Sequence, residues 1–156
     1  MVQRKKITRF GFARMFSKKA FKPKGQKKVE LRTLRALRPE KPFERFYLVE
    51  TFKGSERVAH IDVVSTAEKK VKEIEALFVD PKLREKGIGK KLMEKTLHDL
   101  RKQGVKKLIA VALPEAMDFY KGFGFKQVGE RLNPSMTLSP VMELDLADYF
   151  RKLRKA

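Results

Sequence analysis

Residues 77–89 read LFVDPKLREKGIG, and this stretch decides the fold. Before it, the run at 71–79 has the apolar and β-branched residues of a strand, and Asp80-Pro81 ends that run. After it, apolar residues recur at helical spacing, with charged residues on the other faces. The stretch therefore predicts a strand, a loop with two glycines and an amphipathic helix. The apolar positions of that helix are Ile88, Leu92, Thr96, Leu97 and Leu100.

The loop has the composition of an anion-binding site. Gly87 and Gly89 let the backbone turn tightly and come close to a ligand. The first amides of the helix have no internal acceptor, so they are free to donate to phosphate oxygens. The helix dipole and the cations Arg84, Lys86 and Lys90 favour negative charge there. Taken alone, the two spaced glycines are more often a plain turn that leads into a helix.

The elements on either side predict an α/β (α+β) fold with a mixed, mainly antiparallel central sheet and flanking helices. Short turns join the strands that precede the helix, which indicates an antiparallel meander. An unbroken apolar run follows the helix and is typical of a strand covered on both faces. The expected strands are 29–34, 43–52, 57–66, 71–79, 108–113, 125–131 and 141–146, with a short helix at 115–118 and a basic helix at 147–156.

The composition limits the function classes. The chain has 156 residues, which suits one core, and a net charge of +19, which predicts attraction to polyanions or simply a well-solvated surface. It has no cysteine, which excludes disulfides, thiolate metal sites and a cysteine nucleophile. Two histidines alone cannot form a zinc site, so we expect no metal. No apolar run approaches the ~20 residues of a membrane span. We therefore expect a cytoplasmic protein without membrane contact.

Residues 1–28 differ from the remainder of the chain, residues 29–156. They carry eleven cations and no acid, so we predict a basic N-terminal arm followed by one domain. In one interpretation the arm binds nucleic acid, with cations on phosphates and aromatic rings stacked on bases. In the other, the arm docks on the domain through its aromatic residues. The four phenylalanines concerned are Phe10, Phe12, Phe16 and Phe21.

The central stretch resembles the GNAT superfamily of N-acetyltransferases. The fingerprint of that family is Gln/Arg-x-x-Gly-x-Gly/Ala, and Arg84, Gly87 and Gly89 match its three fixed positions. A second motif of the family is similar to the segment with Ala116, Phe119-Tyr120 and Gly124-Phe125. The resemblance spans residues 73–125, about a third of the chain. The spacing differs from that of the Walker phosphate loop, and no Gly-Lys-Ser/Thr follows.

The resemblance implies that acetyl-coenzyme A is the cosubstrate. Backbone amides of the loop would hold its pyrophosphate, and the main chain at the end of the preceding strand would pair with the pantetheine arm. The implied binding residues are Leu77, Phe78, Val79, Arg84, Glu85, Lys86, Gly87, Ile88, Gly89 and Lys90.

Acetyl transfer to an amine needs a base for the amine, stabilisation of the carbonyl oxygen and an acid for the leaving thiolate. The resemblance implies that Tyr120 is the acid, since its phenol keeps its proton at neutral pH; otherwise it packs in the core. Glu75 is the candidate base, or else it and Glu73 are solvated strand carboxylates. His60 is a weaker candidate, and His98 is expected to face solvent.

Two departures from the family pattern concern the cosubstrate and the acceptor. Leu113 stands where the family usually has an asparagine that helps to hold the pantetheine, so the cosubstrate contacts there are expected to differ. In addition, the two helices that usually shape the acceptor site do not fit between residues 37 and 43. The acceptor pocket is therefore expected to be reduced, or completed by residues 1–28 or by another chain. The predicted function is transfer of acetyl to an amine on a protein, a small molecule or an RNA-associated group, by a monomer or homodimer. The alternatives are a nucleic-acid-binding protein that keeps the fold without turnover, and a coenzyme A sensor.

Overall fold

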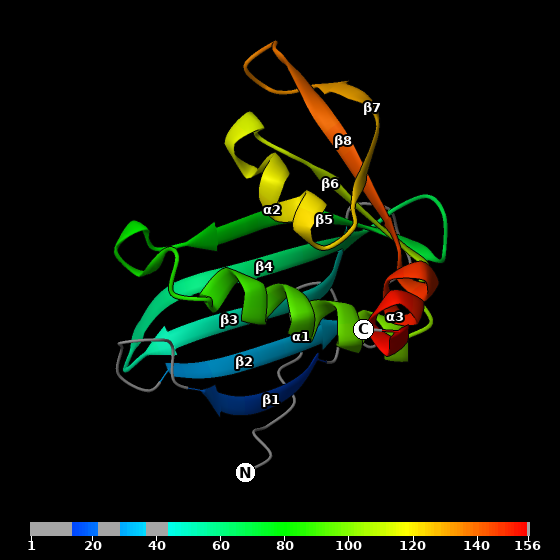
Figure 1. Cartoon of the computed structure of the whole chain (residues 1–156). Helices are drawn as coiled ribbons and strands as arrows, with labels where there is room; N and C mark the ends of the chain where they lie inside the picture. The colour runs from blue at the N-terminus through cyan, green and yellow to red at the C-terminus, as the bar shows by residue number, and fades with distance from the viewer. Residues whose placement is uncertain (1–13, 22–28, 37–43, 156) are drawn as a thin grey trace.

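The structure is a computed structural model, and it describes residues 14–21, 29–36 and 44–155 (Figure 1). Eight strands form one sheet in the order β1-β2-β3-β4-β5-β6-β8-β7. Neighbouring strands are antiparallel except β5 and β6, which are parallel. The strands are β1 Arg14–Phe21, β2 Val29–Ala36, β3 Arg45–Lys53, β4 Glu56–Ser65, β5 Val71–Val79, β6 Lys107–Val111, β7 Lys126–Leu132 and β8 Leu138–Asp145.

The three helices of the described residues lie on one face of this sheet (Figure 1). They are α1 Ile88–Lys102, α2 Met117–Gly122 and α3 Leu146–Lys155, and 3-10 turns at Pro81–Leu83 and Pro114–Ala116 precede α1 and α2. The predicted fold class, a mixed and mainly antiparallel sheet with flanking helices, is confirmed. Gly104 has φ +80 just after α1, as expected of a glycine that ends a helix.

Part of the segment predicted to be a basic arm, residues 14–21, is a strand of the sheet. Residues 14–21 pair antiparallel with β2 from Arg14↔Ala36 to Phe21↔Val29. Composition alone did not distinguish this strand from an arm, because a cation-rich segment is compatible with an eight-residue edge strand as well as with an arm. The rest of the predicted arm, at 1–13 and 22–28, lies outside the described residues, as does Phe43, the first residue of the strand predicted at 43–52.

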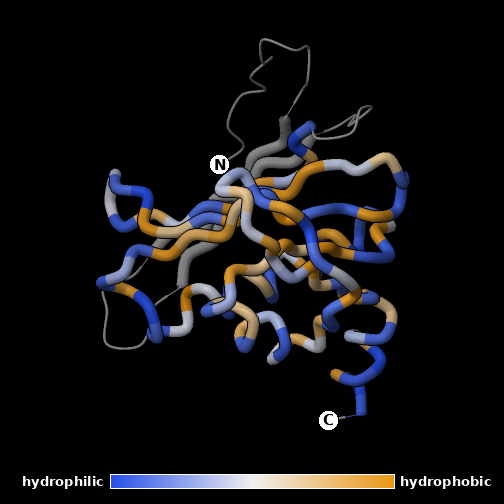
Figure 2. The backbone as a smooth tube through the Cα atoms, turned by 90° about the horizontal axis from the view of Figure 1, so that it is seen from above, coloured by the Kyte–Doolittle hydropathy of each residue, from blue (hydrophilic) through white to orange (hydrophobic). Residues whose placement is uncertain are grey.

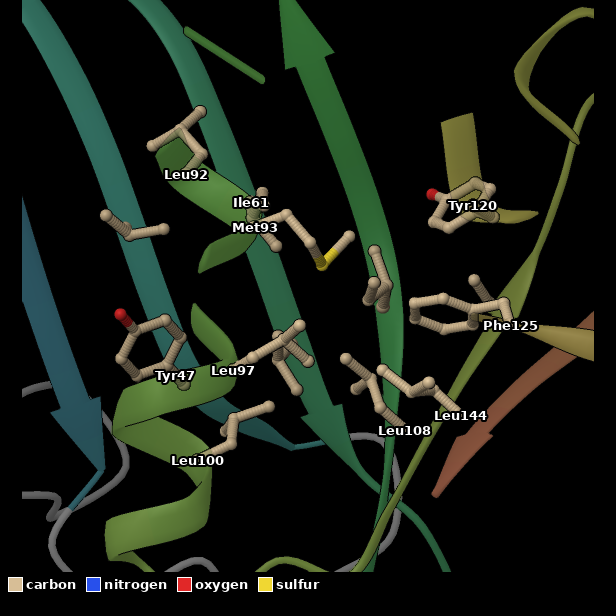
Figure 3. Packing of buried hydrophobic residues seen from close by; sticks show 14 of the residues in the cluster. Tyr47, Ile61, Leu92, Met93, Leu97, Leu100, Leu108, Tyr120, Phe125 and Leu144 are labelled. Carbon is tan, nitrogen blue, oxygen red and sulfur yellow. The ribbon is translucent and has the colours of Figure 1, made fainter. Parts of the chain in front are cut away.

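The core lies between the sheet and α1. Leu92, Met93, Leu97 and Leu100 of α1 are completely buried against β4 and the neighbouring strands (Figure 3). Burying one such side chain stabilises the fold by about 1.5–3 kcal/mol. The apolar positions predicted for this helix from its 3.6-residue period are all buried. This packing fixes the first turn of α1 above the end of β5.

A polar contact also holds α1 on the sheet. The hydroxyl of Tyr47 in β3 donates to Asp99 of α1 at 2.7 Å, and Lys95 lies 2.9 Å from the same carboxylate. Tyr47 is fully buried and Asp99 is 2% exposed. Because the carboxylate is paired and hydrogen-bonded, its burial is compensated.

One prediction about burial was wrong. The apolar run at 108–113 was expected to be a strand covered on both faces. β6 ends at Val111, and only its alternate residues Leu108 and Ala110 are fully buried. Ile109 is partly exposed, because it lies on the face without a described helix.

Candidate active site

Strands β5 and β6 separate part-way along their length. Their parallel pairing runs from Val71↔Lys107 to Ile74↔Ala110 and ends there, although β5 continues to Val79. In the described structure no strand pairs with residues 75–79 on that side, so main-chain donors and acceptors are left free along this edge. The two strands therefore form a fork in the sheet, and one branch of this fork is the end of β5.

A β-bulge lies where the fork opens. Asp62 of β4 pairs with Ala76, and the next residue, Val63, pairs with Ile74, so Glu75 has no partner in the register. Bulges re-aim side chains and occur next to active sites. The side chain of Glu75 is exposed. The candidate base is thus located at the branch point of the fork.

The loop between β5 and α1 presents free amides. Glu85 and Gly87 have φ +62 and φ +84, which turn the backbone into α1. The first bond at the start of the helix runs from the amide of Lys91 to the carbonyl of Gly87, at 3.1 Å. The amides of residues 85–90 donate to no acceptor in the part of the chain that the structure describes. No side chain caps the helix at Gly87, so this terminus suits an anion.

The side chain of Arg84 turns back onto β5. Its Nε donates to the carbonyl of Val79 at 3.1 Å. The bond ties the beginning of the loop to the end of the strand. The guanidinium stays exposed, so its remaining donors are available to a phosphate group.

Tyr120 of α2 is buried among aromatic rings. It is 5% exposed, and its ring makes edge contacts with Phe119 at 5.5 Å and Phe125 at 5.2 Å. Its hydroxyl makes no hydrogen bond to a described residue and points toward β5 in Figure 3. Burial raises the pKa of Tyr120 to about 12, so the phenol keeps its proton at neutral pH.

The acids around the branch point are paired with arginines, with one exception. Arg45 makes a bidentate contact with Asp62, with its shortest distance at 2.6 Å. Arg131 of β7 lies 2.6 Å from Glu73 of β5. Glu75 has no ion pair with a described residue. The contact of Arg131 with Glu73 could not be predicted from local sequence, because the two residues are 58 positions apart and meet only through the sheet order.

The predicted histidines occupy different places. His60 lies on β4 in register with Phe78 of β5, near the fork. His98 is exposed on α1, as predicted, and its ring packs against Phe150 of α3 at 5.0 Å. Leu113, at the position where the family usually has an asparagine, is 58% exposed.

The described residues contain no group of three or more His, Asp or Glu side chains placed to hold a metal ion. Within the same residues, no helix has the length and apolar character needed to cross a membrane.

The forked mixed sheet, with free amides at the helix that follows one branch, agrees with the fold that the sequence resemblance implies. The chain belongs to the GNAT acetyltransferase family, because its residues 22–144 match the family model of the acetyltransferase (GNAT) domain. Comparison with curated protein sequences finds no match.

Solved structures share the fold. A putative GNAT acetyltransferase from Desulfovibrio desulfuricans matches with TM-score 0.58 and 18% identity, over 64% of this chain and 68% of that one. The Escherichia coli ribosomal-protein-S18-alanine N-acetyltransferase matches with TM-score 0.53 and 19% identity, over 64% and 68%. The PaiA N-acetyltransferase of Thermoplasma acidophilum, solved with coenzyme A, matches with TM-score 0.52 and 21% identity, over 63% and 59%.

Proposed function

We propose that this chain transfers the acetyl group of acetyl-coenzyme A to an amine by direct attack of that amine. The observation that carries the proposal is the combination of a fork beyond Ile74 with free amides at residues 85–90. The first offers main-chain partners to an extended amide-containing chain, and the second offers donors to a pyrophosphate. Coenzyme A contains both groups, the amides of its pantetheine arm and a pyrophosphate.

The residues around the fork fit this cosubstrate. A Cβ at Gly89 would meet only ordinary contacts, at 3.5 Å from the ring of Phe119 and 3.6 Å from Val79. Because Gly89 carries no side chain, the helix terminus stays open to a ligand. The amides of 85–90, with Arg84 and Lys86 beside them, would hold the pyrophosphate. Leu77, Phe78 and Val79 would pair with the pantetheine amides through their main chain. When bound, the thioester supplies the activated acetyl group.

Tyr120 and Glu75 would move the protons. The amine nitrogen forms a bond to the carbonyl carbon while the bond from that carbon to sulfur breaks. Tyr120 would give its proton to the leaving sulfur, since its raised pKa keeps the phenol protonated. Glu75, exposed at the bulge, would accept the amine proton directly or through a water molecule. After turnover the two groups exchange protons with solvent.

The test is release of coenzyme A thiol from acetyl-coenzyme A across a panel of amines. The panel contains peptides with free N-termini, peptides whose only amine is a lysine, and small alkylamines. We expect at least one class to release thiol and to yield an acetylated product by mass spectrometry. Binding of acetyl-coenzyme A without turnover on any acceptor would contradict the enzymatic proposal and favour a sensor.

A further inference from the structure

His60 lies on the face of the sheet that carries none of the described helices. Its neighbour Ile61 is fully buried in the core beneath α1. Successive side chains of a strand point to opposite faces, so His60 points away from α1. Its register partners are Glu50 of β3 and Phe78 of β5. The same face therefore presents His60 next to the free branch of the fork.

The imidazole has one nitrogen buried without a partner. Nδ1 of His60 is inaccessible and makes no hydrogen bond. The ring lies 5.8 Å from that of Phe78, which is 43% exposed. Buried polar atoms without a partner are rare, and unpaired donors are rarer than unpaired acceptors. The favoured tautomer is therefore the one with a lone pair on Nδ1 and the hydrogen on Nε2.

Burial and two nearby arginines lower the pKa of the His60 imidazole. Burial is the largest cause that lowers the pKa of His60, and Arg57 and Arg45 lower it further, against the opposing effects of Asp62 and Glu50. Arg57 is paired with Glu50 at 3.1 Å and Arg45 with Asp62 at 2.6 Å. A neutral ring with Nδ1 unprotonated presents one hydrogen-bond donor, the Nε2–H group.

The distance between His60 and the branch point limits which part of an acceptor can reach the imidazole. Asp62 is opposite the bulge at Glu75, and His60 is two residues further along β4. Two residues of a strand span about 6.6 Å, close to the length of two peptide units at about 3.8 Å each. An amine that reacts at the bulge would therefore have its first or second peptide carbonyl near His60.

We propose that Nε2–H of His60 donates a hydrogen bond to a main-chain carbonyl of a polypeptide acceptor, and that the adjacent side chain of this acceptor packs on Phe78. The proposal rests on the proposed function, because it takes the bulge at Glu75 as the place of the reacting amine. It assigns polypeptides as the acceptor class, in preference to alkylamines that have no carbonyl. An apolar side chain next to that carbonyl would pack on the exposed ring of Phe78.

The test compares two acceptors in wild type and variants. One is a dipeptide amide with an apolar second residue, and the other is an alkylamine of the same length without a carbonyl. His60→Ala is expected to lower kcat/KM for the dipeptide amide about three- to tenfold, the range of one hydrogen bond, mainly through KM. The alkylamine is expected to react equally with both proteins. His60→Gln keeps an N–H donor and should restore part of the loss.

His98→Ala is the matched control, because His98 is exposed on α1 and packs on Phe150. It should leave both acceptors unchanged. An equal loss on both acceptors in His60→Ala, or no loss on either, overturns the proposal. So does a wild type that prefers the alkylamine.

A second measurement needs no turnover. Nitrogen-15 NMR of the histidine side chains, assigned with His60→Gln, should show His60 neutral at pH 7 with its hydrogen on Nε2. A hydrogen on Nδ1, or an imidazolium at pH 7, overturns the proposal. Absence of acetyl-coenzyme A binding by calorimetry would instead defeat the proposed function, so the two failures are distinguishable.

Discussion

Gly89 of α1 lies against the ring of Phe119 of α2. A Cβ at Gly89 would stand 3.5 Å from that ring and 3.6 Å from Val79 of β5. The contact brings together three elements that are separate in the sequence: the end of β5, the start of α1 and the helix that carries Tyr120. The free amides of the loop and the buried phenol therefore belong to one region of the molecule.

Substitutions at Gly89 should distinguish the effect of side-chain volume on cosubstrate binding from the effect of negative charge. Gly89→Ala is expected to bind acetyl-coenzyme A almost as wild type does, because its methyl group meets only ordinary van der Waals contacts. Gly89→Glu is expected to abolish binding, since it places a carboxylate at the helix terminus that would receive the phosphates. Isothermal titration calorimetry measures both. Equal affinities in the two variants would show that the phosphates bind elsewhere.

Tyr120→Phe should reduce turnover by about 10²–10⁴-fold, the usual contribution of a general acid. The variant keeps the ring contacts with Phe119 and Phe125, so its melting temperature and its affinity for acetyl-coenzyme A should be nearly unchanged. Because the pKa of Tyr120 is raised to about 12, its ionisation should cause no loss of activity below about pH 11. Unaltered turnover in the variant would leave Tyr120 with a packing role alone.

Glu75→Gln is expected to lower turnover by about 10²–10⁴-fold as well, with the affinity for acetyl-coenzyme A retained. Glu73→Gln is the matched control two residues away on the same strand, where the carboxylate pairs with Arg131. The control should keep its activity and lose at most about 1 kcal/mol of stability, because the arginine side chain is 48% exposed and ion pairs near the surface contribute little. If both variants have the same activity as wild type, Glu75 is not the base.

Removal of residues 1–28 should destabilise the protein. This truncation deletes β1 and makes β2 the free edge of the sheet. A loss of about 2 kcal/mol would lower the melting temperature by roughly 4–8 °C, and an unpaired β2 would promote association. A shorter truncation that removes residues 1–13 retains β1 and serves as the control. Identical melting curves for all three proteins would argue against a contribution of β1 to stability.

Local patterns predicted most of the fold. The 3.6-residue period gave α1, and Gly87 and Gly89 marked the loop, because these signals depend on neighbouring residues. Other features depend on pairing between distant residues and leave no local trace. They include the bulge at Glu75, set by register with β4, and the ion pair of Arg131 with Glu73.

The edge strand β1 could not be predicted from the sequence for a further reason. Its residues read as a basic segment, and charge is compatible with an exposed edge strand as well as with an arm. The orphaned Nδ1 of His60 was equally unpredictable, since a lone histidine in a strand says nothing about what surrounds its ring.

Binding of acetyl-coenzyme A to the full chain tests the central claim most directly. Ligand at a hundred times its dissociation constant adds about 2.7 kcal/mol to stability, which raises the melting temperature by roughly 5–11 °C in a domain of this size. We expect a shift in this range with acetyl-coenzyme A, and none with Gly89→Glu. A wild-type melting curve that does not move at millimolar acetyl-coenzyme A, with no heat of binding by calorimetry, would contradict the account.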